Sequence, residues 1–141
     1  MNTGTETNRA VLRTAFERLQ SGDLDACAEL LTEDFTASLP GVPDPLRGRE
    51  VWRLGARAML EGFPDLRITV EDMFGAHDRV AVRLRFRGTH RGTFQGVAAT
   101  HRPVGFRSIE LYRFEDGRIA EEWVAPDLMD LMRQIAPPPG P

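Results

Sequence analysis

The chain has 141 residues, of which 41% are hydrophobic and 28% are charged, and its formal net charge is −3. This length predicts a single domain, which we place at residues 1–136, followed by a Pro-rich tail at residues 137–141. No apolar run approaches the roughly 20 residues of a membrane helix, and the N-terminus lacks the pattern of a signal peptide. We therefore expect a cytoplasmic protein without a membrane partner. The acidic balance also argues against nucleic acid as a partner.

Cysteine and histidine usage gives little support for a metal centre. Cys27 is the single cysteine, which excludes an intramolecular disulfide and a thiolate cluster. The three histidines, His77, His90 and His101, show neither HxxxH nor HExxH spacing. We expect no metal site.

Helical periodicity occurs in four parts of the chain. The segments whose apolar residues recur at helical intervals are residues 11–19, 24–31, 49–61 and 128–135. Asp23 is the expected N-cap of the short second helix, and Pro126 suits the first turn of the last one. The order predicts three N-terminal helices and one short C-terminal helix.

Alternation of apolar and polar residues predicts strands elsewhere. The segments with this period are residues 35–39, 66–70, 80–86, 104–114 and 118–124. A turn near His77 and Asp78 joins the second and third of them. The resulting sheet is mostly antiparallel and must curl over its helices to bury one face, which places the chain in the α+β class.

The last strand pair decides which side chains share a face. If residues 115–117 form a three-residue bulged turn, then Glu110 lies opposite Glu122 and Ser108 lies opposite Val124. Two glutamates would then sit side by side on one face of the sheet.

Longer motifs in the second half resemble the SnoaL-like polyketide cyclases, a branch of the nuclear transport factor two-like superfamily. The motifs are GTHRGTFQG at residues 88–96, RPVGFRSIELYRFEDGRIAEEW at residues 102–123, and the Pro-Asp pair at residues 126–127. The first half is similar in the order of its elements. The resemblance implies a cone-shaped, strongly curved sheet that encloses one pocket together with the helices.

The resemblance also implies a chemistry. Members of this family close a ring of an aromatic polyketide by an intramolecular aldol step without metal or cofactor. They use an aspartate late in the last strand as acid/base, assisted by a histidine on the neighbouring strand. In this sequence the aspartate position is Val124 and the histidine position is Glu110. We therefore expect no cofactor, and any catalysis must use different residues.

Three side chains are candidates for that catalysis. Opposed carboxylates of Glu110 and Glu122 in an apolar pocket cannot both ionise cheaply, so one could act as acid and the other as base. Alternatively, both lie at the pocket mouth and pair with nearby arginines such as Arg107, Arg113 or Arg118. His90 shares the strand parity of buried residues, and it either shuttles a proton or has a structural role within the sheet.

Aromatic and strand residues are the candidates for substrate binding. The residues that we expect to line the pocket, or else to fill the core, are Phe16, Phe35, Trp52, Phe63, Phe106, Ser108, Tyr112 and Val124. Phe16 and Trp52 are preferred because the matching positions of the family lie near the ligand.

The opposite face of the last strand pair should be covered. Ile109, Leu111, Ile119 and Trp123 are too apolar to face water together. In the resembled superfamily this convex face commonly packs against a second subunit, so we expect a homodimer through it. The row of arginines at residues 83, 85 and 87 also points outward, where salt bridges or solvation are favoured over nucleic-acid binding.

Two functions follow from the sequence. The first is a cofactor-independent enzyme that cyclises or isomerises a small hydrophobic, polyketide-like molecule by acid/base catalysis, with hydrolysis as the runner-up reaction. The second is a non-catalytic protein of the same fold that binds a small molecule and has lost the acid/base aspartate.

Overall fold

The computed structural model describes residues 3–136, and the predicted tail at residues 137–141 lies outside them. The helices are α1 (Thr3–Ser21), α2 (Leu24–Ala28), α3 (Arg49–Gly62) and α4 (Leu128–Ile135). The strands are β1 (Leu31–Ser38), β2 (Leu46–Arg47), β3 (Arg67–Ala76), β4 (Arg79–Thr89), β5 (Pro103–Glu115) and β6 (Arg118–Pro126). No helix in this part of the chain is long and apolar enough to cross a membrane. The predicted α+β class is confirmed.

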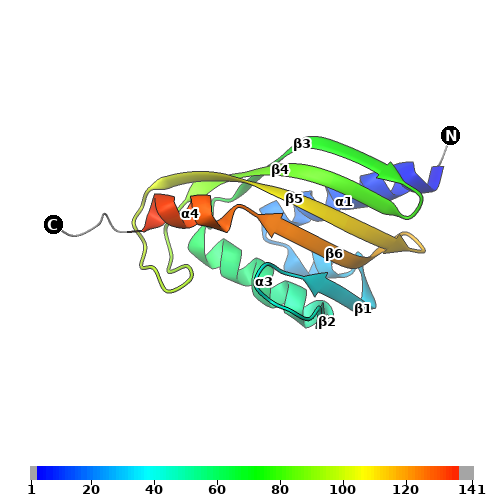
Figure 1. The fold of residues 1–141 in the computed structure, drawn as a ribbon, viewed down its shortest axis with the longest axis horizontal. Helices are drawn as coiled ribbons and strands as arrows, with labels where there is room; N and C mark the ends of the chain where they lie inside the picture. Colours follow the sequence, from blue (N-terminus) through cyan, green and yellow to red (C-terminus); the bar gives the residue numbers. More distant parts are fainter. Residues whose placement is uncertain (1–2, 137–141) are drawn as a thin grey trace.

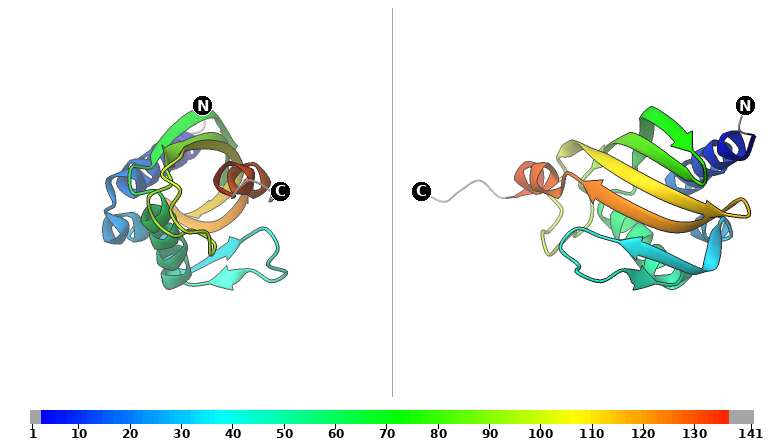
Figure 2. Two further views of the ribbon diagram at one scale, coloured as in Figure 1. Left: turned by 90° about the vertical axis from the view of Figure 1, so that its left-hand side faces the viewer. Right: turned by 45° about the vertical axis from the view of Figure 1, so that its right-hand side comes forward.

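The strands form one sheet in the order β2-β1-β6-β5-β4-β3 (Figure 1). Strand β1 runs parallel to β6, and the other neighbours are antiparallel. Seen from its end, the sheet curls around the space that α1, α2 and α3 close on one side, and α4 lies at one end (Figure 2). The expected curved and mostly antiparallel sheet is therefore confirmed.

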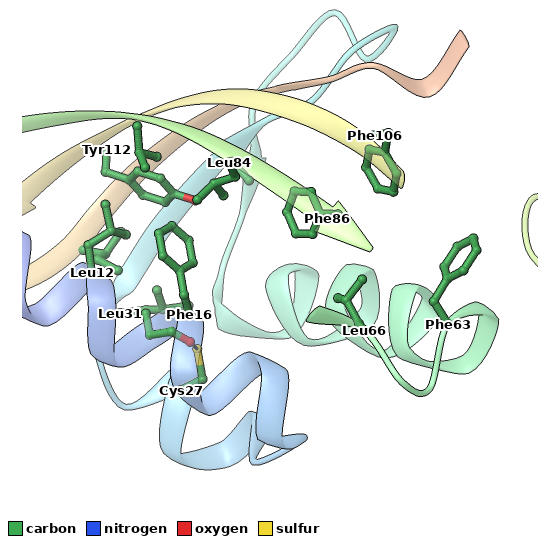
Figure 3. Close-up of a cluster of buried hydrophobic side chains, with 14 of the residues drawn as sticks. Leu12, Phe16, Cys27, Leu31, Phe63, Leu66, Leu84, Phe86, Phe106 and Tyr112 are labelled. Carbon is green, nitrogen blue, oxygen red and sulfur yellow. Dashed lines mark hydrogen bonds between the residues drawn. The ribbon is translucent and has the colours of Figure 1, made fainter. Parts of the chain in front are cut away.

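The concave side of the sheet packs against the helices through large apolar side chains. Leu12 and Phe16 of α1 are buried and lie beneath the central strands (Figure 3). The ring of Phe16 meets Tyr112 of β5 edge to face, with 6.2 Å between ring centroids. Because full burial of one such side chain contributes about 1.5–3 kcal/mol, these contacts fix how α1 sits across the sheet.

The turn between β5 and β6 is shorter than the sequence analysis predicted. Asp116 and Gly117 form a two-residue turn with φ angles of 48° and 78°, and Glu115 pairs with Arg118 on either side of it. Positive φ at both central positions is the requirement of a type I′ hairpin, which Asp-Gly satisfies. The predicted three-residue turn over residues 115–117 is therefore wrong.

A β-bulge follows the turn and changes which side chains face inward. Arg113 pairs with Glu121 whereas Phe114 pairs with Ile119, so Ala120 is the extra residue on β6. Ile119 therefore points into the core and is 2% exposed. The prediction that Ile119 belongs to the convex face is wrong, because the alternation assumed no interruption between the turn and Trp123.

Smaller boundary differences have local causes. Helix α2 ends at Ala28, and β1 begins at Leu31. The predicted second helix extended to Leu31, so its end was placed too late. Pro126 is the last residue of β6 and does not begin a helix. Asp127 is the N-cap of α4 instead, because its carboxylate accepts the backbone N–H of Asp130 at 3.0 Å.

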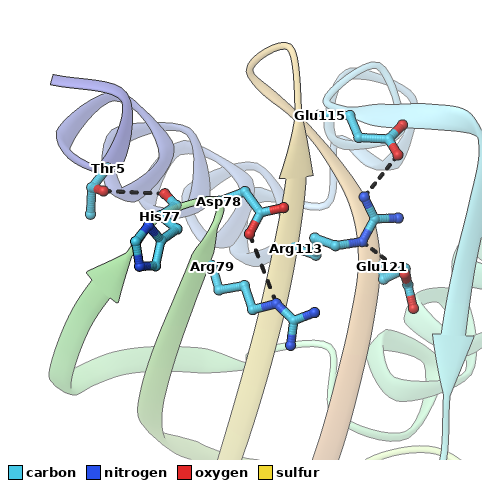
Figure 4. Close-up of polar contacts among 7 residues, drawn as sticks. All are labelled: Thr5, His77, Asp78, Arg79, Arg113, Glu115 and Glu121. Atoms are coloured by element: carbon cyan, nitrogen blue, oxygen red, sulfur yellow. Dashed lines mark hydrogen bonds and ion pairs between the residues drawn. The ribbon is translucent and has the colours of Figure 1, made fainter. Parts of the chain in front are cut away.

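Charged groups flank the convex face of the sheet. At the turn end, the guanidinium of Arg113 donates to Glu115 at 2.8 Å and to Glu121 at 2.7 Å (Figure 4). Near the middle of the sheet, Arg107 donates to Glu71 at 2.8 Å. Between these ion pairs lie apolar side chains of β3, β5 and β6, of which Phe74 and Ile109 are 63% and 62% exposed.

Candidate functional site

The concave face of the sheet and the helices enclose a cavity of about 230 Å³. Its wall is formed by Leu12, Ala15, Phe16, Leu19, Cys27, Leu31, Ala37, Leu39, Val51, Trp52, Gly55, Ala56, Met59, Phe86, Phe106, Glu110, Tyr112, Ile119, Glu122, Val124 and Pro126. A mostly apolar cavity with a few converging polar groups is typical of a small-molecule site.

The polar side chains of this wall come from one hairpin. Glu110 and Tyr112 alternate along β5, and Glu122 lies on β6 directly across from Tyr112. Within the described residues, the cavity wall contains no arginine or histidine. The two carboxyl groups therefore share an apolar space without a basic side chain to balance them.

Glu110 is held by two hydroxyl groups of its own strand. Ser108 Oγ donates to Glu110 Oε2 at 2.6 Å, and the Tyr112 hydroxyl donates to Glu110 Oε1 at 2.5 Å. The side chain is only 7% exposed. Each oxygen of the buried carboxyl group thus accepts one hydrogen bond, an arrangement that favours its ionised form.

Burial raises the pKa values of the acids of this cluster. Burial raises the pKa of Glu122 to about 8, the negative charge of Glu110 raises it as well, and hydrogen bonding with Tyr112 opposes both. Burial also raises the pKa of Glu110, while the hydrogen bonds from Ser108 and Tyr112 lower it. Burial and the charge of Glu110 raise the pKa of the Tyr112 phenol well above 10.0.

The two carboxyl groups form a coupled pair, and the geometry indicates where their proton resides. Glu110 has two donors that stabilise a carboxylate, whereas Glu122 faces a neighbouring negative charge in an apolar wall. We therefore place the carboxylate at Glu110 and the neutral carboxyl group at Glu122 near neutral pH. A base and an acid in one cavity can remove a proton from one substrate atom and protonate another.

The register differs from the predicted one in the pairing of these acids. Glu110 lies opposite Val124, and Glu122 lies opposite Tyr112. The prediction that Glu110 faces Glu122 directly is wrong because the two-residue turn and the bulge shift β6 relative to β5. Both glutamates still line the same cavity, since a shift of two residues preserves the face of a strand.

The predicted substrate-binding residues divide into two groups. Phe16, Trp52, Phe106, Tyr112 and Val124 belong to the cavity wall. The predicted residues that are buried outside that wall are Phe35, Phe63 and Ser108. Phe35 and Phe63 are fully buried in the core, and Ser108 stands behind Glu110 as its hydrogen-bond donor.

The structure does not bring His90 to the two glutamates. His90 is fully buried, as its strand parity predicted, but it lies outside the cavity wall. Its Nδ1 accepts the backbone N–H of Thr100 at 3.2 Å and lies 2.9 Å from the hydroxyl group of that residue. Its ring lies 5.6 Å from that of Phe63. These contacts are those of a histidine that ties the loop after β4 to the sheet.

The arginine pairs considered as an alternative for the glutamates form elsewhere. Arg107 binds Glu71, and Arg113 binds Glu115 and Glu121. The predicted ion pairs of Arg107 and Arg113 with the cavity glutamates are therefore wrong, because these arginines alternate with the acids and project to the convex side.

Several wall residues were not among the predicted site residues. Phe86 has the strand parity of Val82 and Leu84, which pointed to the concave side, and its ring stacks on Phe106 with 5.1 Å between centroids. Met59 belongs to the apolar stripe of α3. Cys27 also lies on the wall, and burial raises the pKa of its thiol to about 12. Periodicity alone could have indicated Phe86 and Met59 as candidates.

Metal ligands do not cluster within residues 3–136. No three His, Cys, Asp or Glu side chains of the described chain are grouped as a metal ion would require.

Comparison with known proteins agrees with the fold. The model of the SnoaL-like polyketide cyclase family matches residues 9–135. A comparison with curated protein sequences found no match. The chain is similar in structure to a protein of Jannaschia sp. CCS1 that is provisionally described as a SnoaL-like polyketide cyclase. The two share 26% identity and a TM-score of 0.90 over 99% of this chain and 98% of that one.

Two Streptomyces structures are also similar. IdmH of Streptomyces antibioticus, provisionally described as a polyketide cyclase, has 33% identity and a TM-score of 0.82 over 92% of this chain and 99% of its own. TsrD of Streptomyces laurentii has 27% identity and a TM-score of 0.78 over 91% and 96%, respectively. Because the family model covers most of the chain and the fold agrees, this protein belongs to the SnoaL-like polyketide cyclase family.

Proposed function

We propose that this protein is a cofactor-independent acid/base enzyme that cyclises or isomerises a small hydrophobic carbonyl compound of polyketide type. The observation that carries the proposal is the pair of glutamates on the wall of an otherwise apolar, aromatic-lined cavity. Membership of the cyclase family supports the reaction class. The raised pKa of Glu122, about 8, supplies a neutral acid at physiological pH.

The chemistry that this pair can perform begins beside a carbonyl group. The Glu110 carboxylate removes a proton from the carbon next to the carbonyl, while the neutral Glu122 donates to the carbonyl oxygen and stabilises the developing enolate. In an isomerisation, a proton returns to a different carbon. In a ring closure, the nucleophilic carbon bonds to a second carbonyl carbon, whose oxygen takes up the proton that Glu110 removed.

Two features of the sequence narrow the mechanism. The chain contains no lysine, so a Schiff base between a lysine side chain and the substrate cannot activate the carbonyl group. Val124 occupies the position of the aspartate that the resembled cyclases use. The proposed base is therefore Glu110, which lies opposite Val124 across the hairpin.

A second candidate is a protein that binds a small molecule without transforming it. The observation that favours it is the same Val124, because an aliphatic side chain there cannot serve as the acid/base group. This candidate uses the same cavity and its aromatic walls. In this second candidate, Glu110 and Glu122 contribute to the affinity for the ligand but not to a reaction.

Exchange of substrate hydrogen tests the two candidates. The probe is 2-tetralone, a small bicyclic ketone, whose hydrogens next to the carbonyl are followed by NMR in D₂O. The enzyme should accelerate their exchange, and Glu110→Gln or Glu122→Gln should each lower that rate by about a hundredfold or more. Glu115→Gln is the matched control, because Glu115 is an exposed acid of the same hairpin. Binding without accelerated exchange would favour the second candidate.

A further inference from the structure

We propose that Ser108 is the positioning residue of the base: from outside the cavity, its hydroxyl group holds one carboxylate oxygen of Glu110 and keeps that side chain in its ionised form. This inference rests on the proposed function, in which Glu110 removes the substrate proton. It adds a residue that does not touch the substrate and acts only through Glu110.

The neighbours of Glu110 across the sheet leave its hydrogen bonding to its own strand. Glu110 lies opposite Val82 of β4 and opposite Val124 of β6. Neither of these aliphatic side chains can donate a hydrogen bond. The donors that the structure gives the carboxyl group are Ser108 and Tyr112, which precede and follow it by two residues along β5. The ionised form of Glu110 therefore depends on these two hydroxyl groups.

The two donors differ in their place relative to the cavity. Tyr112 belongs to the cavity wall, whereas Ser108 lies outside it and is 1% exposed. A ligand that fills the cavity can contact the Tyr112 hydroxyl group and compete for its hydrogen bond. It does not reach Ser108. Oxygen Oε2 of Glu110, which accepts from Ser108 at 2.6 Å, thus keeps its donor when the cavity is filled.

Ser108 is enclosed by the strands on both sides. It pairs with Leu84 of β4, which is fully buried, and with Pro126 of β6. Within residues 3–136, Glu110 is the partner that the structure gives its hydroxyl group. Solvent does not reach this position, so the donor to Oε2 is Ser108 itself. Loss of this hydroxyl group would leave one oxygen of a buried carboxylate without a donor.

The charged and titratable groups around Glu110 do not replace this donor. They are Tyr112 on its own strand, Glu122 on β6, and Cys27 of α2, which lies near Tyr112, while Arg18 of α1 lies near that thiol. The described part of the cavity wall contains no basic side chain. Hydrogen bonds from hydroxyl groups therefore offset the cost of burying the carboxylate.

The bond from Ser108 persists through the proposed reaction. A C–H bond of the substrate breaks, its electron pair passes toward the carbonyl group, and the proton forms an O–H bond with Glu110. We assign this new bond to Oε1, the oxygen on the side of the wall residue Tyr112. Oε2 then remains an acceptor for the hydrogen of Ser108. Ser108 holds Glu110 in both states and neither gains nor loses a proton.

The pH dependence of 2-tetralone exchange tests this role. The acid limb of kcat/KM reports the ionisation of the base in the free enzyme. In Ser108→Ala the carboxylate loses one donor, so the acid limb should move to higher pH by about one unit. Exchange on the acid side of the profile should then be about tenfold slower. KM should stay unchanged, since Ser108 does not touch the substrate.

A conservative variant separates the hydroxyl group from simple packing. Ser108→Thr retains the donor, so its acid limb should lie where that of the wild type lies. A rate of Ser108→Ala that falls by the same factor at every pH would mean that Ser108 only fills space, and would overturn the proposal. An acid limb that stays in place in Ser108→Ala would overturn it as well.

Titration of the ligand-free protein keeps this proposal distinct from the proposed function. The side-chain carboxyl carbons of glutamate are labelled with ¹³C and followed by NMR, and the signal of Glu110 is the one missing in Glu110→Gln. Its titration should lie at higher pH in Ser108→Ala than in the wild type. If Ser108→Ala does not fold, Ser108→Cys takes its place, and its weaker donor should give a smaller shift in the same direction.

The two results together decide each outcome. A Glu110 titration that is the same with and without the Ser108 hydroxyl group would overturn the proposal, whatever the rate of exchange. Absence of exchange in the wild type, with the titration shifted as expected, would refute the enzyme and leave the hold of Ser108 on Glu110 intact.

Discussion

Tyr112 lies directly across the β5–β6 hairpin from Glu122, while its hydroxyl group donates to Glu110 on its own strand. The phenol therefore lies at the corner between two acids that occupy diagonal positions of one sheet face. A direct cross-strand pair would bring the two carboxyl groups into contact. In the observed arrangement the hydroxyl group bonds to Glu110, and burial together with the charge of Glu110 raises the pKa of Glu122 to about 8.

The proton held by Glu122 should make stability depend on pH. Its pKa is about 8 in the folded chain and about 4.3 in an unfolded one. Between these values the folded state binds more protons, so the free energy of unfolding falls as pH rises. The contribution is fully present below the unfolded pKa and is lost as pH passes about 8. Glu122 alone should give urea denaturation a slope of up to about 1.4 kcal/mol per pH unit, and the raised pKa of Glu110 acts in the same sense.

Two variants check this assignment. Glu122→Gln should flatten the slope between neutral and mildly acidic pH, whereas Glu115→Gln should retain it. The lowered pKa values of Asp65 and Glu71 act in the opposite sense at more acidic pH and do not overlap with this window. A slope that persists unchanged in Glu122→Gln would assign the proton to another group.

Ile119→Ala should be strongly destabilising because the bulge at Ala120 turns Ile119 into the core. We expect a loss of about 2–5 kcal/mol in the free energy of unfolding, which is typical for truncating a buried isoleucine. Leu54→Ala is the control, since Leu54 on α3 is 60% exposed and its truncation should change stability by less than about 0.5 kcal/mol. Similar values for both variants would mean that Ile119 faces outward.

Val124→Asp should place a third acid beside the pair. Position 124 faces Glu110 across the hairpin, so a carboxylate there would repel the Glu110 carboxylate and raise the pKa of the cluster further. We expect the variant to lose more stability at pH 8 than at pH 5.5. Val124→Asn introduces a polar group of the same size without charge, and its loss should be equal at both pH values. Equal losses for the aspartate variant would show that the acids do not interact.

We propose that two copies of the chain associate through the convex face. The exposed Phe74 and Ile109 lie there, together with Leu111 and Trp123, and ion pairs flank them. Light scattering of the wild type should give the mass of a dimer. Ile109→Asp should give a monomer, and Leu54→Asp on a helix should not. A wild type that stays monomeric at all concentrations would refute this association.

Much of the fold was predictable because periodicity reports directly on burial. The helices and most strands lie where apolar spacing placed them, and His90 is buried as its parity predicted. The bulge was not predictable in this way, since nothing in the alternation of residues 118–124 marks Ala120 as unpaired. The Asp116-Gly117 turn was recognisable, because this dipeptide is a strong signal for a two-residue hairpin.

Only part of the candidate site was predicted, because strand parity gives limited information about a cavity. Parity assigns a residue to a face but does not say how far along the strand the helices cover that face. Glu110 and Glu122 lie on the cavity wall, on the face that the family resemblance indicated, whereas His90 is buried outside that wall. Phe35 and Phe63 show the same limit, since both are fully buried without reaching the cavity wall.

The bulge at Ala120 decides which residues of β6 after it point into the cavity. Moving that insertion past position 124 would turn Glu122 and Val124 outward and bring Glu121 and Trp123 inward, with every other strand in place. Trp123 would then take the place of Val124 opposite Glu110, and Glu121 would take the place of Glu122 opposite Tyr112. The shift of a single insertion would thus put an indole beside the Glu110 carboxyl group and reshape the cavity without any change in the sequence.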